Sequence, residues 1–298
     1  MNHLASIEYR LKSIKYLTML KKNNTYNELS RIFDLPITVL NRYIKGHVLP
    51  SFERAEEIYN IYKKIYDIKK EIRAKIKFDE NKYFNISSLV GNIFLLKQVV
   101  SEIYNKYYDK NLTKVLTAAV NGIPLAVLTS NELGIDTLIA KKRREAGVSE
   151  FIVENYSPSR TGMILSLYLP VNMLSNIDRV LIIEDIIRSG ETQQALCRIV
   201  TKSKALISGI FTFVGIGEKS WKTHLKKTIL INYIENSNIN NKNREEILTA
   251  FDNIEYDKIK SIINEEDISD EIIQLITNLF NDKIINVFIN IPEPAEIK

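Results

Sequence analysis

The chain has 298 residues, of which 45% are hydrophobic and 26% are charged, and its formal net charge is +5 at pH 7. This composition is typical of a folded soluble protein and excludes a disordered chain, and the length allows two domains that each bury a core. No apolar run approaches the roughly 20 residues of a membrane-spanning helix, no apolar signal segment opens the chain, and the single cysteine excludes an internal disulfide. We therefore expect a cytoplasmic protein with no membrane partner.

Charge is spread unevenly along the chain. Residues 1–78 contain 16 Lys and Arg against 8 Asp and Glu, whereas the remainder contains 25 against 28. A basic first part favours a polyanionic partner such as nucleic acid. The alternative is a solvated basic surface that binds nothing.

The first 78 residues are predicted to be helical. Apolar residues at helical spacing predict a helix over 4–22. In the stretch TYNELSRIFDLPITVLNRYIKG (25–46), a T-x-x-E capping box opens a short helix that ends near Asp34. Pro36 suits the start of a second helix, which Gly46 ends, and two short helices joined by a tight turn form a helix-turn-helix. A further helix over 49–78, with tyrosines spaced to pack on a neighbour, lengthens into a connector.

The stretch ELSRIFDLPITVLNRYIKG resembles the helix-turn-helix of lambda-repressor-like regulators, over about residues 25–60. The resemblance implies double-stranded DNA as the partner, with the second helix in the major groove. The DNA-binding residues that it implies are Ile37, Thr38, Asn41, Arg42 and Lys45. Arg42 would pair with guanine, Asn41 with adenine, and Lys45 would lie near phosphates. The alternatives are a solvated helix face and, less favoured because the pattern lacks stacking aromatics, an RNA partner.

From residue 85 onward, helices and strands alternate. Helices are predicted over 85–108, 124–134 and 191–202, and strands over 113–120, 136–140, 163–170, 179–184 and 205–215, with no element in the polar segment 141–162. This alternation predicts an α/β fold with a mostly parallel sheet that is covered on both faces. Helices around 245–254 and 270–280 and an apolar run over 285–291 follow. The predicted domains are 1–78, 79–225 and a helical C-terminal extension, 226–298.

The stretch RVLIIEDIIRSGETQQAL (179–196) carries the candidate chemistry. An apolar strand ends at Glu184 and Asp185, a short loop over 186–190 follows, and then a helix begins. Ligands of open parallel sheets lie beyond the carboxyl ends of the strands, and the amides of a helix N-terminus bind anions. Carboxylates accept hydrogen bonds from sugar hydroxyls, so a 5-phosphoribosyl group fits both features. The alternative is a buried strand that ends in a solvated acidic turn.

The same stretch resembles the ligand-binding signature of type I phosphoribosyltransferases, over roughly residues 85–222. The resemblance implies the parallel-sheet fold of that family and, as ligand, 5-phosphoribosyl 1-diphosphate (PRPP) or a nucleotide, with Mg²⁺ bound through the ligand. The implied ligand-binding residues are Glu184, Asp185, Ile186, Ile187, Arg188, Ser189, Gly190, Glu191 and Thr192, together with Asn121, Gly122, Lys141, Lys142, Tyr156 and Trp221.

Several of these residues have specific roles in the resemblance. Gly122 would let the backbone approach a diphosphate, which Lys141 and Lys142 would also contact. The segment 147–162 corresponds to a mobile hood, in which Tyr156, Ser157, Ser159 and Thr161 contact the ligand or form a solvated loop. The segment 215–221 resembles the base side of xanthine phosphoribosyltransferases, where Trp221 stacks on a purine or fills the core.

Arg188 departs from the pattern of active enzymes, which carry a small residue at this position. A basic residue resembles the bacterial purine repressors, whose domain senses its ligand without turnover. We therefore expect a homodimeric transcription regulator of purine or nucleotide metabolism that senses PRPP or a nucleotide. The alternative is an active purine phosphoribosyltransferase with an appended DNA-binding module. Neither hypothesis assigns a catalytic residue or a metal site made by the protein alone.

Overall fold

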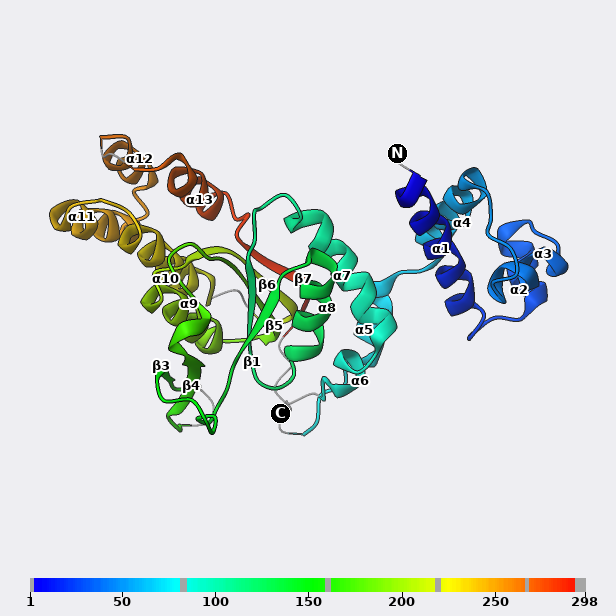
Figure 1. The fold of residues 1–298 in the computed structure, drawn as a ribbon, viewed down its shortest axis with the longest axis horizontal. Coiled ribbons are helices and arrows are strands. Elements are labelled where there is room, and N and C mark those ends of the chain that lie inside the picture. The colour runs from blue at the N-terminus through cyan, green and yellow to red at the C-terminus, as the bar shows by residue number, and fades with distance from the viewer. Residues whose placement is uncertain (1–2, 81–84, 159–161, 218–220, 266–267, 293–298) are drawn as a thin grey trace. The chain divides into compact units, whose positions relative to one another are not determined.

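The structure is a computed structural model of the chain and describes residues 3–80, 85–158, 162–217, 221–265 and 268–292. It contains two compact units, residues 1–71 (the N-terminal unit) and 72–298 (the C-terminal unit), whose elements are labelled in Figure 1. Within the described ranges, no helix combines the length and hydropathy that crossing a membrane requires.

The N-terminal unit is entirely helical. Its elements are α1 (His3–Leu20), α2 (Tyr26–Phe33), α3 (Ile37–Ile44) and α4 (Phe52–Ile65), while α5 (Ile68–Lys75) crosses the boundary between the units. The single helix predicted over 49–78 is therefore wrong, because the chain leaves the helical conformation at Tyr66, where φ is −111° and ψ is 106°.

Helices α2 and α3 are two short helices joined by a tight turn, at the positions that the sequence predicted. The capping box is confirmed, since Thr25 Oγ1 accepts a hydrogen bond from the Glu28 amide at 3.2 Å and the Thr25 amide donates to Glu28 Oε2 at 2.6 Å. Asp34 ends α2 in the left-handed region with φ 48°, and Pro36 directly precedes α3. Five apolar side chains are predicted by the helical spacing to face inward; Leu29, Phe33, Leu35 and Leu40 are buried, whereas Ile44 is only half-buried.

Tyrosine side chains join α4 to α1. Tyr16 stacks on Tyr62 with ring centroids 4.2 Å apart, and Tyr62 stacks on Tyr66 at 5.0 Å. Aromatic pairs of this kind stabilise a helix interface beyond the area they bury. The spacing of the tyrosines in 49–78 therefore identified a real packing surface.

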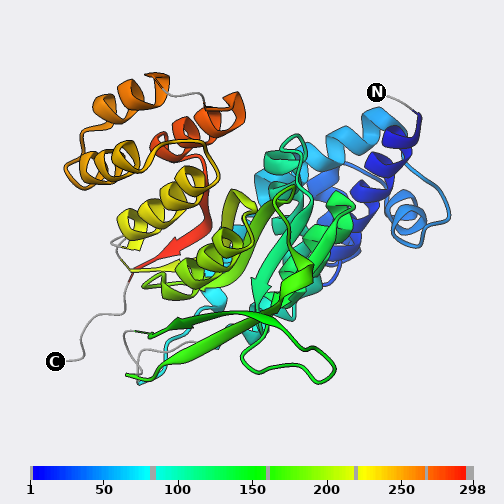
Figure 2. The ribbon, with the colours of Figure 1, turned by 60° about the vertical axis from the view of Figure 1, so that its left-hand side comes forward.

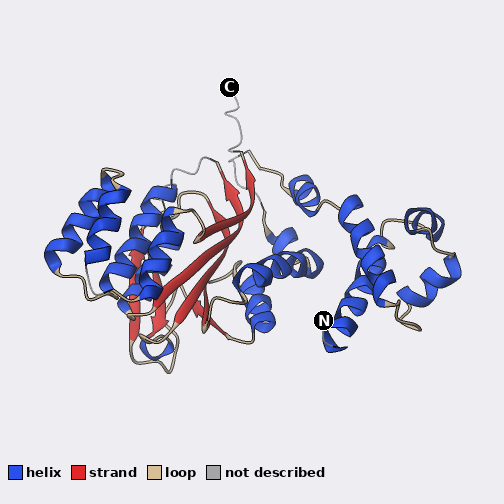
Figure 3. Cartoon of the chain, turned by 90° about the horizontal axis from the view of Figure 1, so that it is seen from above, coloured by secondary structure: helices blue, strands red, loops and turns tan. Residues whose placement is uncertain are grey.

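The C-terminal unit is built on a five-stranded parallel sheet, which confirms the predicted fold class. The order is β2-β1-β5-β6-β7, and every neighbouring pair is parallel. The strands are β1 (Lys114–Ala118), β2 (Asp136–Ala140), β5 (Arg179–Ile187), β6 (Leu206–Ile216) and β7 (Ile285–Ile291). Helices lie on both faces of the sheet (Figure 3). They are α6 (Ser87–Val90), α7 (Ile93–Tyr107), α8 (Ile123–Leu133), α9 (Glu191–Lys202) and α10 (Trp221–Glu235).

The helix predicted over 85–108 is two helices, because Asn92 caps a new one. Its side chain accepts hydrogen bonds from the Phe94 and Leu95 amides, so α7 begins at Ile93. Helix α7 then approaches the sheet closely. A β-carbon on Gly209 would lie 2.5 Å from the Tyr107 ring, so only glycine fits at that point of β6.

A second sheet of two antiparallel strands, β3 (Phe151–Tyr156) and β4 (Leu165–Pro170), lies beside the main one (Figure 2). Strand β3 falls in the segment predicted to have no element, so that prediction was wrong. Glu154 is buried in β3 and forms ion pairs with Arg198 and Lys202 of α9 at 2.7 and 2.6 Å. These partners are distant in sequence, which is why the polar pattern of the segment concealed a strand.

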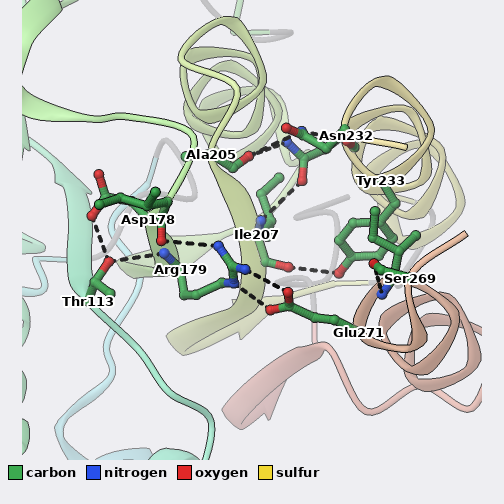
Figure 4. A network of polar contacts seen from close by, with 12 residues as sticks. Thr113, Asp178, Arg179, Ala205, Ile207, Asn232, Tyr233, Ser269 and Glu271 are labelled. Atoms are coloured by element: carbon green, nitrogen blue, oxygen red, sulfur yellow. Dashed lines mark hydrogen bonds and ion pairs between the residues drawn. The ribbon is translucent and has the colours of Figure 1, made fainter. Parts of the chain in front are cut away.

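The last quarter of the chain adds one strand to the sheet and three helices that pack on α10 or on one another. It contains α11 (Asn241–Asp252), α12 (Tyr256–Glu265), α13 (Asp270–Phe280) and β7, which pairs with β6. In Figure 4, Tyr233 Oη donates to the Ile207 carbonyl at 2.8 Å, and the Arg179 side chain forms a two-pronged ion pair with Glu271. The boundary predicted at residue 225 thus falls inside α10, and the segment beyond it shares hydrogen bonds with the sheet.

Candidate functional site

The acidic pair lies near the carboxyl end of β5, at the centre of the sheet. Strand β5 continues to Ile187, where it pairs with Gly215 of β6, so the predicted loop over 186–190 shortens to 188–190. The strand is longer than predicted because β6 offers backbone partners up to that point. Ile187 is consequently a core residue that is 1% exposed, and Ile186 also belongs to the strand.

Glu184 is buried, with 4% of its surface exposed. Its Oε1 accepts hydrogen bonds from the Ala118 amide at 2.6 Å and from Thr117 Oγ1 at 3.0 Å. The pKa of Glu184 is raised to about 8, mainly by burial and in addition by the neighbouring Asp185 charge, although the two hydrogen bonds and Lys142 act in the opposite direction. The carboxyl group is therefore mostly neutral at pH 7.

Asp185 is only partly buried and has different neighbours. Burial raises its pKa, whereas hydrogen bonds from the Ile186 amide and the Asn121 side chain and the positive charge of Lys142 lower it. Three residues that are far apart in sequence, Asn121, Lys142 and Asp185, are thus brought together at one edge of the sheet. Lys142 is exposed and acts electrostatically on both acids.

The loop before α8 also lies at this edge. Gly122 directly precedes α8, and a β-carbon there would lie 2.3 Å from Thr117 Oγ1 and 3.5 Å from Glu184 Oε1. A larger residue would therefore collide with the residues that hold the acidic pair. Lys141, predicted for the same diphosphate, forms an ion pair with Glu145 at 2.6 Å.

The loop 188–190 leads into the N-terminus of α9. Gly190 has φ 85°, which favours glycine, and as the N-cap residue of α9 it has no side chain that could cap the helix. The first amides of α9 therefore remain available to an anion. Ser189 donates a hydrogen bond to Glu191, Thr192 shares one with Tyr156 of β3, and Arg188 is half-buried at the start of the loop.

Trp221 packs behind this loop. It is 4% exposed, and its Cβ would lie 3.0 Å from a β-carbon on Gly190. This burial favours the core-filling alternative, and stacking on a base stays a prediction. Residues 218–220 of the same segment, and Ser159 and Thr161 of the hood, lie outside the described residues.

Two buried residues at this edge were missed by the sequence analysis. Thr117 binds Glu184, and Gln193 donates from Nε2 to the Ile186 carbonyl at 2.8 Å. Gln193 is 2% exposed and supports the end of β5 from the first turn of α9. Neither had a sequence signal, because threonine is common inside strands and glutamine on exposed helix faces.

The residues predicted to contact DNA occupy one side of α3. Ile37 is 41% exposed, and Thr38, Arg42 and Lys45 are exposed as well. Asn41 is half-buried, and its Oδ1 accepts a hydrogen bond from Tyr26 at 3.1 Å. An asparagine that reads adenine through both amide atoms would have to give up this bond.

Comparisons with known proteins match the C-terminal unit. Xanthine phosphoribosyltransferase from Macrococcus caseolyticus is 32% identical over 136 residues, which are 43% of this chain and 66% of that enzyme. The xanthine phosphoribosyltransferase from Streptococcus agalactiae serotype Ia is 31% identical over 137 residues, or 45% of this chain and 71% of the enzyme.

Solved structures show a more distant likeness. The APRTase from Giardia lamblia in complex with 9-deazaadenine has a TM-score of 0.48 at 18% identity, covering 55% of this chain and 93% of that one. The adenine phosphoribosyltransferase from Saccharomyces cerevisiae has a TM-score of 0.44 at 14% identity, covering 50% and 88%. Residues 90–246, more than half of the chain, match the phosphoribosyl transferase domain, so the protein belongs to the phosphoribosyltransferase family.

Proposed function

We propose that the C-terminal unit transfers the 5-phosphoribosyl group of PRPP to a purine base. One observation carries the proposal: Asp185 and the N-terminus of α9 lie at the same carboxyl edge of the sheet, within the domain that matches the phosphoribosyltransferase family. The transfer breaks the bond between ribose C1 and the diphosphate oxygen, forms a bond from C1 to a base nitrogen, and releases the proton of that nitrogen. The similarity to xanthine phosphoribosyltransferases supports a purine as the acceptor.

Each end of the ligand would meet a different part of the edge. The first amides of α9, with the Ser189 and Thr192 hydroxyls, suit the 5′-phosphate, because the helix dipole favours negative charge there. Asp185 accepts hydrogen bonds from the ribose hydroxyls. The loop 119–122 and the cationic Lys142 suit the diphosphate, whose developing charge they would stabilise as it departs.

Magnesium fits this site as an ion carried by the ligand. Asp185 supplies a hard oxygen of the kind that Mg²⁺ prefers, and the ligand's hydroxyl and phosphate oxygens would complete the coordination. In the part of the chain that the structure describes, no three His, Cys, Asp or Glu side chains gather into a metal-binding cluster. When bound, the ion would neutralise charge on the diphosphate leaving group.

The proposal is tested by incubating the full chain with PRPP, Mg²⁺ and each purine base in turn and measuring diphosphate release. We expect release that depends on one base and is lost in Asp185→Asn. The variant Asp136→Asn serves as the control, because Asp136 is the first residue of β2 and the proposed site lies at the carboxyl ends of the strands. This variant should keep its activity. No release with any base, although PRPP binds, would reject the transferase and leave a ligand sensor.

A second candidate function is a transcription regulator whose C-terminal unit senses PRPP or a nucleotide. It is favoured by the exposed polar side of α3, where Thr38, Arg42 and Lys45 lie in a segment with 16 basic and 8 acidic residues. A ligand that prefers one conformation of the chain would then change DNA affinity. The half-buried Arg188, a cation in the proposed phosphate loop, is the sequence feature that distinguishes this candidate from active enzymes.

The regulator is tested by selecting duplexes from a random library and measuring their binding with and without PRPP. We expect selection of a palindromic site, since we propose that the chain acts as a homodimer, and a change in affinity when PRPP is added. Failure to enrich any duplex would reject the regulator, and preference for single-stranded RNA would replace DNA as the partner.

A further inference from the structure

The backbone pairing between β5 and β1 ends before the acidic pair. Beyond that point, hydrogen bonds to the side chain of Glu184 connect the two strands. Their last paired residues are Leu116 and Ile182. Beyond this point Glu184 Oε1 accepts hydrogen bonds from the Ala118 amide and the Thr117 hydroxyl, at 2.6 and 3.0 Å. Glu184 therefore fastens the end of β1 to β5, directly before the loop 119–122.

The bound oxygen of Glu184 is enclosed. The residue is 4% exposed, and a β-carbon on Gly122 would lie 3.5 Å from Oε1, so that side of the carboxyl group packs against the loop. Asp185 is less buried and is hydrogen-bonded by Asn121, which is exposed. The two adjacent acids thus have different surroundings, and only Asp185 combines partial exposure with a partner in the loop.

The protonation of Glu184 agrees with a structural role. Burial and the adjacent Asp185 raise its pKa to about 8, so the neutral acid predominates at pH 7. A neutral carboxyl group keeps a carbonyl oxygen, which can accept both hydrogen bonds. A glutamine side chain offers the same acceptor in the same position, whereas it cannot replace a charged acceptor of sugar hydroxyls.

We propose that Glu184 is a positioning residue that holds the loop 119–122 for the diphosphate end of the ligand and does not itself bind the ribose. This inference rests on the proposed function, since it assumes that the edge binds PRPP. Glu184 and Asp185, which the sequence pattern treats alike, then have different roles. Loss of the hydrogen bonds to Glu184 should weaken the binding of ligands that carry a diphosphate on C1. The binding of nucleoside 5′-monophosphates should change little.

The experiment compares four variants of the full chain by calorimetry, with PRPP and Mg²⁺ as one probe and xanthosine or guanosine 5′-monophosphate as the other. Glu184→Gln should stay within about threefold of wild type for both probes, because the acceptor is retained. Glu184→Ala and Thr117→Val should lower the affinity for PRPP about tenfold, which corresponds to the loss of one good hydrogen bond. They should lower the affinity for the nucleotide less than about threefold. Asp185→Asn should weaken both probes.

A readout without ligand accompanies the titrations. Hydrogen exchange of the amides of residues 118–122 should speed up in Glu184→Ala and Thr117→Val and stay unchanged in Glu184→Gln. Circular dichroism establishes that each variant is folded, and Thr117→Val supplies the same test if Glu184→Ala does not fold.

Two results would overturn the inference. If Glu184→Gln weakens both probes as much as Asp185→Asn does, Glu184 is a ribose ligand. If Glu184→Ala and Thr117→Val leave exchange and PRPP affinity at wild-type values, the link does not position the loop. If the wild-type chain binds neither probe, the proposed function itself fails, a result that the exchange data distinguish from failure of the link.

Discussion

Gly122→Ala tests the packing that underlies the candidate site. The backbone of Gly122 has φ −70°, which alanine adopts freely, so the entire effect of the substitution comes from the added methyl group. That group would lie 2.3 Å from Thr117 Oγ1, about 1.1 Å closer than the 3.4 Å at which ordinary contact begins. Thr117 is fully buried and cannot move into solvent.

The structure can respond in two ways, and both cost free energy. If the loop moves, overpacking of this kind costs about 1–3 kcal/mol. If Thr117 rotates away, its hydrogen bond to Glu184 is lost, which adds about 1 kcal/mol. We expect the free energy of unfolding to fall by about 2–3 kcal/mol and PRPP affinity to fall as well, because the displaced loop is the proposed diphosphate site.

The assay is urea unfolding at pH 7 combined with PRPP calorimetry. Gly134→Ala is a matched control, since Gly134 has φ 71° and open space around it at the end of α8. It should cost about 1–2 kcal/mol from backbone strain alone and leave PRPP affinity unchanged.

A double variant provides the refutation. Replacing Thr117 by alanine removes the atom that Gly122→Ala would strike, so the double variant should lose less stability than the two single losses together. Additive losses would show that the Thr117 contact is not the source of the effect, and the described packing of the loop would be rejected.

Four further outcomes are expected. Asp185→Asn should weaken PRPP binding at least about tenfold in calorimetry, because the ribose hydroxyls lose a charged acceptor; an unchanged affinity would show that Asp185 does not bind the ribose. The pKa of Glu184 is raised in the folded chain to about 8 from 4.5, so the folded state binds more protons and stability should decline from pH 4.5 to pH 8. Unfolding titrations across this window should show a smaller decline in Glu184→Gln, and identical slopes would contradict the assigned pKa. Glu154→Gln should cost about 1–2 kcal/mol, since a buried carboxylate loses its charge beside two partly exposed cations, and should speed proteolysis of the β3–β4 hairpin; equal cleavage rates would count against this link. Arg42→Ala should remove sequence preference in DNA binding while PRPP affinity stays constant, as footprinting and calorimetry would show; an unchanged footprint would exclude Arg42 as a base-reading residue.

Local patterns in the sequence determined the elements that depend on neighbours in the chain. The capping box at Thr25 and the proline at 36 placed α2 and α3, because both signals act within one helical turn. The alternation of apolar runs predicted the parallel sheet, and the bounds of β2 and α9 agree with the predicted ranges. The acidic pair and the following glycine also identified the edge of the sheet where the candidate site lies.

Tertiary structure alone decided which groups meet at that edge. The bond from the Ala118 amide to Glu184 joins residues 66 positions apart, and no local pattern indicates it. Pairing with β6 likewise extended β5 through Ile187 and brought β7 into the sheet. Strand β3 pairs with the neighbouring β4, but its buried Glu154 depends on Arg198 and Lys202, which are distant in sequence. Hydrogen bonds and burial depend on the partners that the fold supplies, so two adjacent acids of the same chemical type acquired different environments.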